Sequence, residues 1–193
     1  MTRTDLGFGQ LLVASPRLAD PNFVDTVVLL LDTGGEGALG VVLNRPMPAP
    51  LPDALALWQD RVSPPVHLFE GGPVETNAAL ALAWLPERTA PFEGYRPLGG
   101  YDANPAGRVG LLDLDTDPAD VPPLIGMRIF AGYAGWGSGQ LQREVAGGDW
   151  DVVPGEPADA FGAEHSRLWR DVLRRQPGDL AWHSTRPADP DLN

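Results

Sequence analysis

The hydrophobic positions of the chain fall into short runs separated by glycine, proline and acidic residues. The run at 26–32 (TVVLLLD) is continuously apolar and rich in β-branched residues, and a second run follows at 38–44 (ALGVVLN). Continuous runs of this kind are typical of strands covered on both faces. The short glycine-rich link at 33–37 then predicts that the two runs form an antiparallel hairpin.

Similar runs predict further strands at 10–15, 66–70, 78–84, 108–114, 127–133 and 150–153. Helices are predicted at 52–58, 140–146 and 166–175, with one helical turn at 158–161. The alternate prolines from 46 to 52 indicate an extended connector, 86–107 resembles a loop with weak strand signals, and 135–139 is a glycine loop. The 166–175 helix is amphipathic, because its apolar residues share one face: Leu168, Trp169, Val172 and Leu173.

The length of 193 residues and the lack of an internal repeat or linker favour one domain. We expect a flexible N-terminus at 1–8, a single domain at 9–183 and a flexible, polar C-terminal tail at 184–193.

Composition excludes several kinds of chemistry. The chain has no cysteine, and every basic residue is arginine, so thiolate, Schiff-base and P-loop lysine chemistry are absent. The net charge of −12 weighs against nucleic-acid binding. No signal peptide is recognisable, and the longest apolar runs are too short to span a bilayer. We therefore expect a soluble cytoplasmic protein without a membrane partner.

Five segments occur in order between about residues 9 and 175: 11–16 (LLVASP), 20–23 (DPNF), 37–46 (GALGVVLNRP), 71–74 (GGPV) and 132–141 (GYAGWGSGQL). On these segments the chain resembles the YqgE/AlgH family. The resemblance implies a mixed α/β (α+β) fold with a branched, largely antiparallel sheet, partly curled into a small barrel and surrounded by short helices. The family is labelled as one of transcriptional regulators, but it has no established DNA-binding motif or reaction. The chain departs from the family pattern at 115–123, where three prolines disfavour a short helix.

Residues 132–140 are the most suggestive candidate site. Here a strand leads through glycines into a helix start, and helix N-termini can hold anions. Ser138 could donate to a phosphate and Trp136 could stack on a ring. The alternative is structural: Ser138 caps the helix and Trp136 packs in the core.

Arg45 ends the strand at 38–44 and could clamp a carboxylate or phosphate in a bidentate way. We favour a structural role instead, with an ion pair to Glu70 as the hypothesis. The predicted ligand site thus comprises Arg45, Trp136, Gly137, Ser138, Gly139 and Gln140.

Two other motifs do not predict a cofactor or a metal. Residues 35–40 match G-x-G-x-x-G, but a strand follows instead of the helix that a dinucleotide site needs. Asp113, Asp115 and Asp117 resemble a calcium loop, yet Pro118 and Leu124 stand where the glycine and glutamate of that loop belong. Hairpin and solvated turn residues are the favoured interpretations.

The catalytic and DNA-binding signals are weak. The three histidines, His67, His165 and His183, have no partner at metal-ligand spacing, and Ser138 does not lie in a G-x-S-x-G motif. The arginine-bearing face of the 166–175 helix is typical of a solvated surface, and no helix-turn-helix accompanies it. Enzymatic activity therefore stays open, with the balance against it.

Three hypotheses remain open. The preferred one is a non-enzymatic regulatory or binding protein that acts through contacts with a protein partner. The second is a binder of a small anionic ligand or nucleotide at 132–140, possessing at most weak hydrolytic activity. The third, disfavoured by the acidic charge, is a DNA-binding regulator. The sequence leaves the oligomeric state open.

Overall fold

The protein is described by a computed structural model that covers residues 6–90, 92–99 and 108–185. Its strands are β1 Gln10–Ala14, β2 Val27–Gly34, β3 Gly37–Val42, β4 Pro46–Pro50, β5 His67–Glu70, β6 Val74–Leu85, β7 Tyr95–Pro97, β8 Arg108–Leu112, β9 Gly126–Gly137 and β10 Trp150–Pro154. Its helices are a 3-10 helix η1 Asp53–Trp58, α1 Gln140–Gly147, α2 Pro157–Phe161, α3 Leu168–Arg174 and α4 Leu180–His183.

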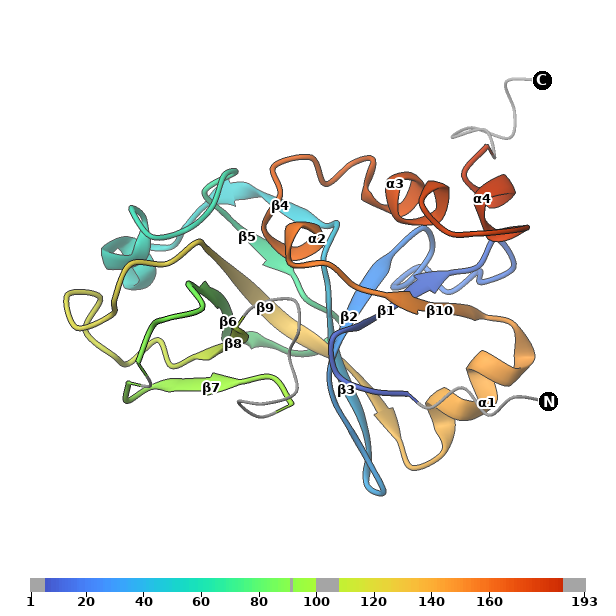
Figure 1. Cartoon of the computed structure of the whole chain (residues 1–193), viewed down its shortest axis with the longest axis horizontal. Helices are drawn as coiled ribbons and strands as arrows, with labels where there is room; N and C mark the ends of the chain where they lie inside the picture. The colour runs from blue at the N-terminus through green and yellow to red at the C-terminus, as the bar shows by residue number, and fades with distance from the viewer. Residues whose placement is uncertain (1–5, 91, 100–107, 186–193) are drawn as a thin grey trace.

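The strands form one ten-stranded sheet that branches at β9 (Figure 1). Its main path runs β10-β1-β2-β3-β9-β6-β8-β7, and β5 joins β9 in parallel while pairing with β4. Strand β9 is long enough to pair with β6 through its first part and with β3 through its last four residues. The fold is mixed α/β with a largely antiparallel sheet curled into a half-barrel, as the family resemblance implied.

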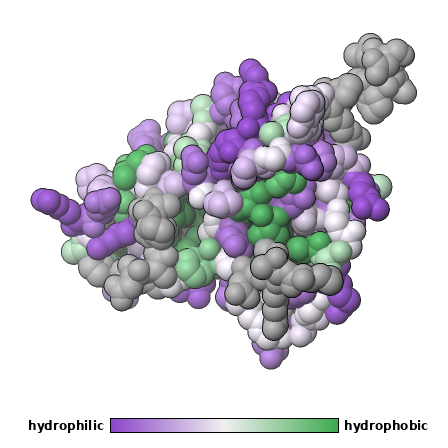
Figure 2. Space-filling model, turned by 45° about the vertical axis from the view of Figure 1, so that its right-hand side comes forward, coloured by the Kyte–Doolittle hydropathy of each residue, from purple (hydrophilic) through white to green (hydrophobic). Residues whose placement is uncertain are grey.

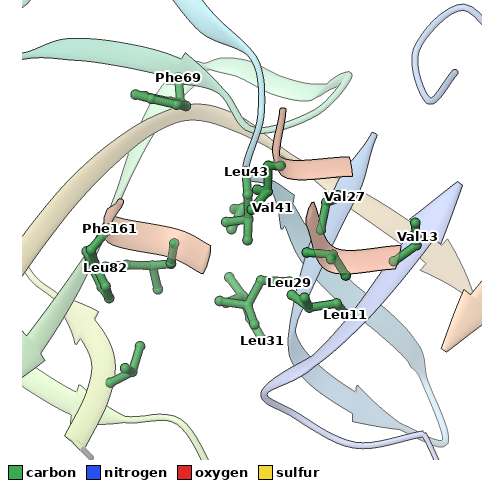
Figure 3. Close-up of a cluster of buried hydrophobic side chains, with 14 of the residues drawn as sticks. Leu11, Val13, Val27, Leu29, Leu31, Val41, Leu43, Phe69, Leu82 and Phe161 are labelled. Carbon is green, nitrogen blue, oxygen red and sulfur yellow. The ribbon is translucent and has the colours of Figure 1, made fainter. Parts of the chain in front are cut away.

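Alternation along β6 explains how the curled sheet buries apolar side chains on both faces. Leu82, with Leu80 and Trp84, packs into the cluster beneath α2 and α3, whereas Ala81, Ala83 and Leu85 join a second cluster around Trp58 and Met127. Figure 3 shows the first cluster, in which side chains from β1, β2 and β3 meet Leu82, Phe69 and Phe161. The sheet thus lies between two layers of packed side chains.

Several predicted elements are confirmed. Strands β2 and β3 form an antiparallel hairpin, so the G-x-G-x-x-G segment is a hairpin turn. The apolar face of the 166–175 helix is buried in α3, and 115–123 contains turns instead of a regular helix.

Three predictions were wrong in detail. The proline connector forms strand β4, because alternate prolines on an edge leave the remaining backbone groups free to pair. The glycine loop is shorter than expected, since β9 continues to Gly137 and leaves Ser138 and Gly139 as the link to α1. A short strand, β7, lies inside the segment predicted as loop.

The described helices include none that is both long and apolar enough to cross a bilayer. Of the two segments predicted to be flexible, residues 1–5 and 186–193 lie outside the described residues.

Candidate functional site

Arg45 anchors a loop of its own chain. Its guanidinium donates hydrogen bonds to the backbone carbonyls of Asn22 at 2.7 Å and Pro21 at 3.0 Å. The hypothesised Glu70 partner is linked through the backbone instead, since Glu70 N donates to Arg45 O at 2.9 Å. The guanidinium therefore holds the 20–25 loop in place.

That loop delivers Phe23 to the indoles of Trp136 and Trp150. The Phe23 ring stacks on Trp136 with centroids 6.0 Å apart and meets Trp150 edge-on at 5.5 Å. Both indole N–H groups donate to the same oxygen of Glu144, each at 2.9 Å. We call Phe23, Trp136, Trp150 and Glu144 the aromatic clasp.

The start of α1 is closed by its own side chains. Gly139 is the N-cap residue, with a left-handed φ of 68°, and no side chain caps the helix. Gln140 accepts a hydrogen bond from Gly137 N at 3.0 Å and donates to Glu144 at 2.8 Å. The structure therefore brings Trp136, Gly137, Gly139 and Gln140 together around a carboxylate, while Ser138 is exposed.

Arg45 reaches this group only through the loop that it anchors. A ligand at these residues stays a prediction, but the Glu144 carboxylate at their centre disfavours an anion there.

A groove of about 960 Å³ lies where β6 runs beyond the end of β8. Its lining residues come from η1, β3, β6, β7, β8, β9 and the turn after β8: Leu39, Ala54, Leu55, Glu75, Ala78, Ala79, Leu80, Ala81, Gly94, Tyr95, Arg96, Leu111, Leu112, Asp113, Leu114, Asp115, Gly132 and Tyr133. We call it the β6 groove. Figure 2 shows apolar residues reaching the surface in recesses between hydrophilic side chains.

A bulge in β6 shapes one end of this groove. The pairing with β9 shifts between Val74 and Ala79, so the residues between them loop out of the ladder. Glu75 adopts a left-handed φ of 47°, a conformation that is uncommon for a residue with a side chain.

Glycines from two family segments make the bulge possible. Gly132 has a left-handed φ of 68°, and a Cβ there would lie 2.7 Å from the carbonyl oxygens of Gly72 and Val74. A Cβ on Gly71 would lie 2.2 Å from Gly132 O. The 71–74 and 132–141 segments therefore meet backbone to backbone and support the groove wall.

The polar side chains of the groove are mostly acidic. Its charged lining residues are Glu75, Asp113 and Asp115, with a single arginine, Arg96, and its hydroxyl-bearing residues are two tyrosines. The lining contains no histidine, serine, threonine or lysine. The groove thus offers apolar contacts and negative charge, without a nucleophile that is paired with a base.

Two buried nitrogen-bearing side chains, Arg128 and His165, lie elsewhere, near α2. Arg128 is fully buried and donates to the carbonyls of Ala160, Gly162 and Pro64, while its remaining Nη1 has no hydrogen-bond partner. Its guanidinium lies 4.2 Å from the centre of the Phe69 ring, and burial lowers its pKa to about 10. Burial, and then repulsion by Arg128, lowers the pKa of His165 to about 4. His165 is therefore neutral at physiological pH.

The described residues contain no group of three or more histidine or carboxylate side chains that could hold a metal ion. Nor does any described histidine bond to Ser138: His67 Nδ1 lies 2.9 Å from Met47 O, His183 faces Asp151 and His165 is buried. The arrangement of these side chains does not assemble a triad.

The β6 groove is not predicted by the amino-acid sequence. Asp113 and Asp115 were noticed as acidic turn residues, but nothing in the apolar run at 78–84 indicates that its first residues are exposed. The useful signal was the glycine pair at 71–72, which marks a close backbone approach.

Comparison with known proteins places the chain in a family. The family model described as AlgH-like matches residues 11–181. The chain belongs to the AlgH-like family. A UPF0301 protein of Streptomyces coelicolor is 50% identical, with 100% of this chain and 98% of the relative covered. A UPF0301 protein of Thermobifida fusca is 48% identical, with 96% and 94% covered.

Two solved structures share the fold of this AlgH-like protein. Protein DIP2367 of Corynebacterium diphtheriae aligns with a TM-score of 0.86 at 30% identity, covering 96% of this chain and 95% of that one. The AlgH protein of Pseudomonas aeruginosa aligns with a TM-score of 0.65 at 26% identity, with 94% of each chain covered. These similarities establish family and fold, and none of the relatives' names states an activity.

Proposed function

We propose that this AlgH-like protein is a non-enzymatic binding protein of the cytoplasm that engages a partner protein through the β6 groove. The observation that carries the proposal is an open groove of about 960 Å³ built on a strained bulge and held by close glycine contacts. Left-handed conformations at residues with side chains cluster at functional sites, where the surrounding structure has to maintain them.

The chemistry of the groove supports binding over catalysis. Its apolar lining offers area for burial, and its polar groups are carboxylates, one arginine and two tyrosines. A hydrolase would need an activated nucleophile within reach of a base and donors for an oxyanion.

The alternative sites receive less support. At 132–140 the polar groups already satisfy one another around Glu144, and a chain of net charge −12 repels a nucleic-acid backbone.

Peptide display tests the proposal. A library of random peptides would be panned against the wild-type protein, and the recovered binders measured on the Ala79→Gln and Ala163→Gln variants. Both alanines are exposed, but only Ala79 lines the groove. We expect binders whose affinity falls at least tenfold with Ala79→Gln and stays unchanged with Ala163→Gln. A panel of binders equally insensitive to both changes would refute the proposal.

A further inference from the structure

On the side of β6 that faces β8, none of the described strands pairs with the first half of β6. Strand β8 pairs with β6 only from Ala81 to Leu85, and its last rung is Leu112 with Ala81. On that side, Ala78, Ala79 and Leu80 precede the ladder in the described residues, and the two alanines are exposed. An unpaired edge of this kind presents backbone N–H and C=O groups to an incoming chain.

Two other outer strands of the sheet, β4 and β7, contain proline. Strand β4 carries Pro46, Pro48 and Pro50, and the short strand β7 ends in Pro97. Proline lacks an N–H and is a common device against edge pairing. The Ala78–Leu80 edge has no proline, and the bulge before it limits the free edge to a short segment.

Acidic side chains lie at both ends of this short edge. Glu75 precedes Ala78 in the bulge, while Asp113 and Asp115 follow Leu112 at the point where β8 leaves the sheet. Between them the groove is lined by apolar side chains, among them Leu39, Leu55 and Leu111. An occupant that matches this pattern has an apolar centre and basic flanks.

We propose that the β6 groove binds an extended segment of a partner protein, about three apolar residues flanked by basic residues, which adds to the Ala78–Leu80 edge as a strand antiparallel to β6. The inference rests on the proposed function and names its ligand. Backbone hydrogen bonds would continue the β8 ladder, and the flanking cations would lie near Glu75 at one end and Asp113 and Asp115 at the other. Antiparallel addition follows the direction of β8.

A defined peptide tests strand addition. The probe is a labelled peptide of three valines with two lysines on each side, and its affinity is measured by fluorescence anisotropy at low ionic strength. Two further peptides carry N-methyl groups, one on the central valine and the other on the two outer valines. Alternate N–H groups of an added strand point to the same side. We therefore expect one N-methylated peptide to lose at least tenfold in affinity while the other keeps it within about threefold.

The electrostatic part has its own variant and control. Asp115→Arg is expected to lower the affinity of the protein for the lysine peptide about fivefold at low ionic strength, and this loss is expected to be smaller in high salt. Glu164→Arg makes the same change of charge at an exposed residue outside the groove and is expected to leave the affinity unchanged.

Three results would overturn the inference: no measurable binding of the lysine peptide, equal effects of the two N-methylations, or equal effects of Asp115→Arg and Glu164→Arg. If display peptides nevertheless depend on Ala79, the proposed function survives and this ligand class is wrong. If neither the display peptides nor the lysine peptide depends on Ala79, both proposals fall.

Discussion

A single carboxylate oxygen holds two tryptophans of this protein. Glu144 accepts both indole N–H groups, and the 20–25 loop, anchored by Arg45, places Phe23 against the same two rings. The family segments at 20–23, 37–46 and 132–141 therefore meet in one internal cluster. Many residues of these family segments therefore serve to hold distant parts of the chain together.

Glu144→Gln should destabilise the protein. The two carboxylate oxygens of Glu144 accept three side-chain hydrogen bonds, from Trp136, Trp150 and Gln140. A glutamine side chain has one carbonyl oxygen and an NH2 group that cannot accept, so at least one of these three bonds is lost. We expect the free energy of unfolding to fall by about 1–3 kcal/mol. Urea denaturation followed by tryptophan fluorescence measures it, with the exposed Glu36→Gln as the matched control. Equal stability of the two variants would contradict the role given to Glu144.

His165 gives the stability a defined pH dependence. Its folded-state pKa is about 4, against an ordinary value of 6.5, because burial and Arg128 both disfavour the charged ring. As the pH falls below 6.5, the unfolded chain takes up this proton before the folded chain does. The stabilising contribution of the neutral His165 ring to the free energy of unfolding is therefore fully present above about pH 6.5. It is lost progressively as the pH falls to about 4, by about 3 kcal/mol in total.

The test compares unfolding free energies at pH 7 and pH 4.5. The loss between these values should be smaller in His165→Asn than in the wild type, whereas His67→Asn, which keeps His165, should follow the wild-type profile. An unchanged loss in His165→Asn would show that other groups carry the acid sensitivity.

At the scale of elements, β9 organises the fold. It pairs with β3, β5 and β6, and Gly132 lies at the point where its partner β6 bulges. Because the space above Gly132 is filled by backbone oxygens, the neighbours cannot move aside as a flexible side chain would.

Gly132→Ala should therefore cost at least about 2 kcal/mol of stability, from the left-handed φ together with the steric overlap. Gly135→Ala is the control in the same strand, since a Cβ there meets its nearest atom, on Tyr133, at an ordinary 3.6 Å. Denaturant titrations of both variants measure the difference. Similar midpoints for the two would contradict the packing described for the bulge.

Helix α2 is fastened to the chain that follows α3. Arg175 donates to both oxygens of the buried Asp159, at 2.6 and 2.5 Å, and Asp159 also accepts from Glu156 N at 2.7 Å. The carboxylate therefore closes the first turn of α2 and holds Arg175 at the same time.

Asp159→Asn should lower the free energy of unfolding by about 2–4 kcal/mol, since it removes the buried, closer counter-charge of a partly buried guanidinium and leaves only the exposed Glu156, at 3.7 Å. Asp171→Asn removes the exposed pair with Arg174 and should change it by less than about 1 kcal/mol. Thermal unfolding of both variants provides the comparison, and a reversed order would refute the assignment.

The sequence predicted the secondary-structure elements better than it predicted which of them pair and where the sites lie. The hairpin at 27–42 and helix α3 follow from local periodicity, which depends on the chain itself. The strand character of Pro46–Pro50 depends on pairing with β5, and the length of β9 depends on β3, so neither is a local property. The same holds for the sites: Trp136 was singled out by its glycine neighbours, but its partner Glu144 and the exposure of Ala78 are products of the tertiary structure.

At the scale of the whole molecule, the net charge of −12 and the β6 groove support the same account. Acidic proteins attract basic segments at long range, and the groove offers a short edge and an apolar lining where such a segment can be held. The sheet positions this surface, and binding of such a segment needs no catalytic step.

The most direct test is an NMR titration of the isotopically labelled protein with the lysine peptide. The account predicts that amide shifts concentrate in Val74–Ala81 of β6 and in residues 111–115, while the aromatic clasp and α1 stay unchanged. Shift changes centred on 132–140 or on α3, with the β6 edge silent, would contradict it.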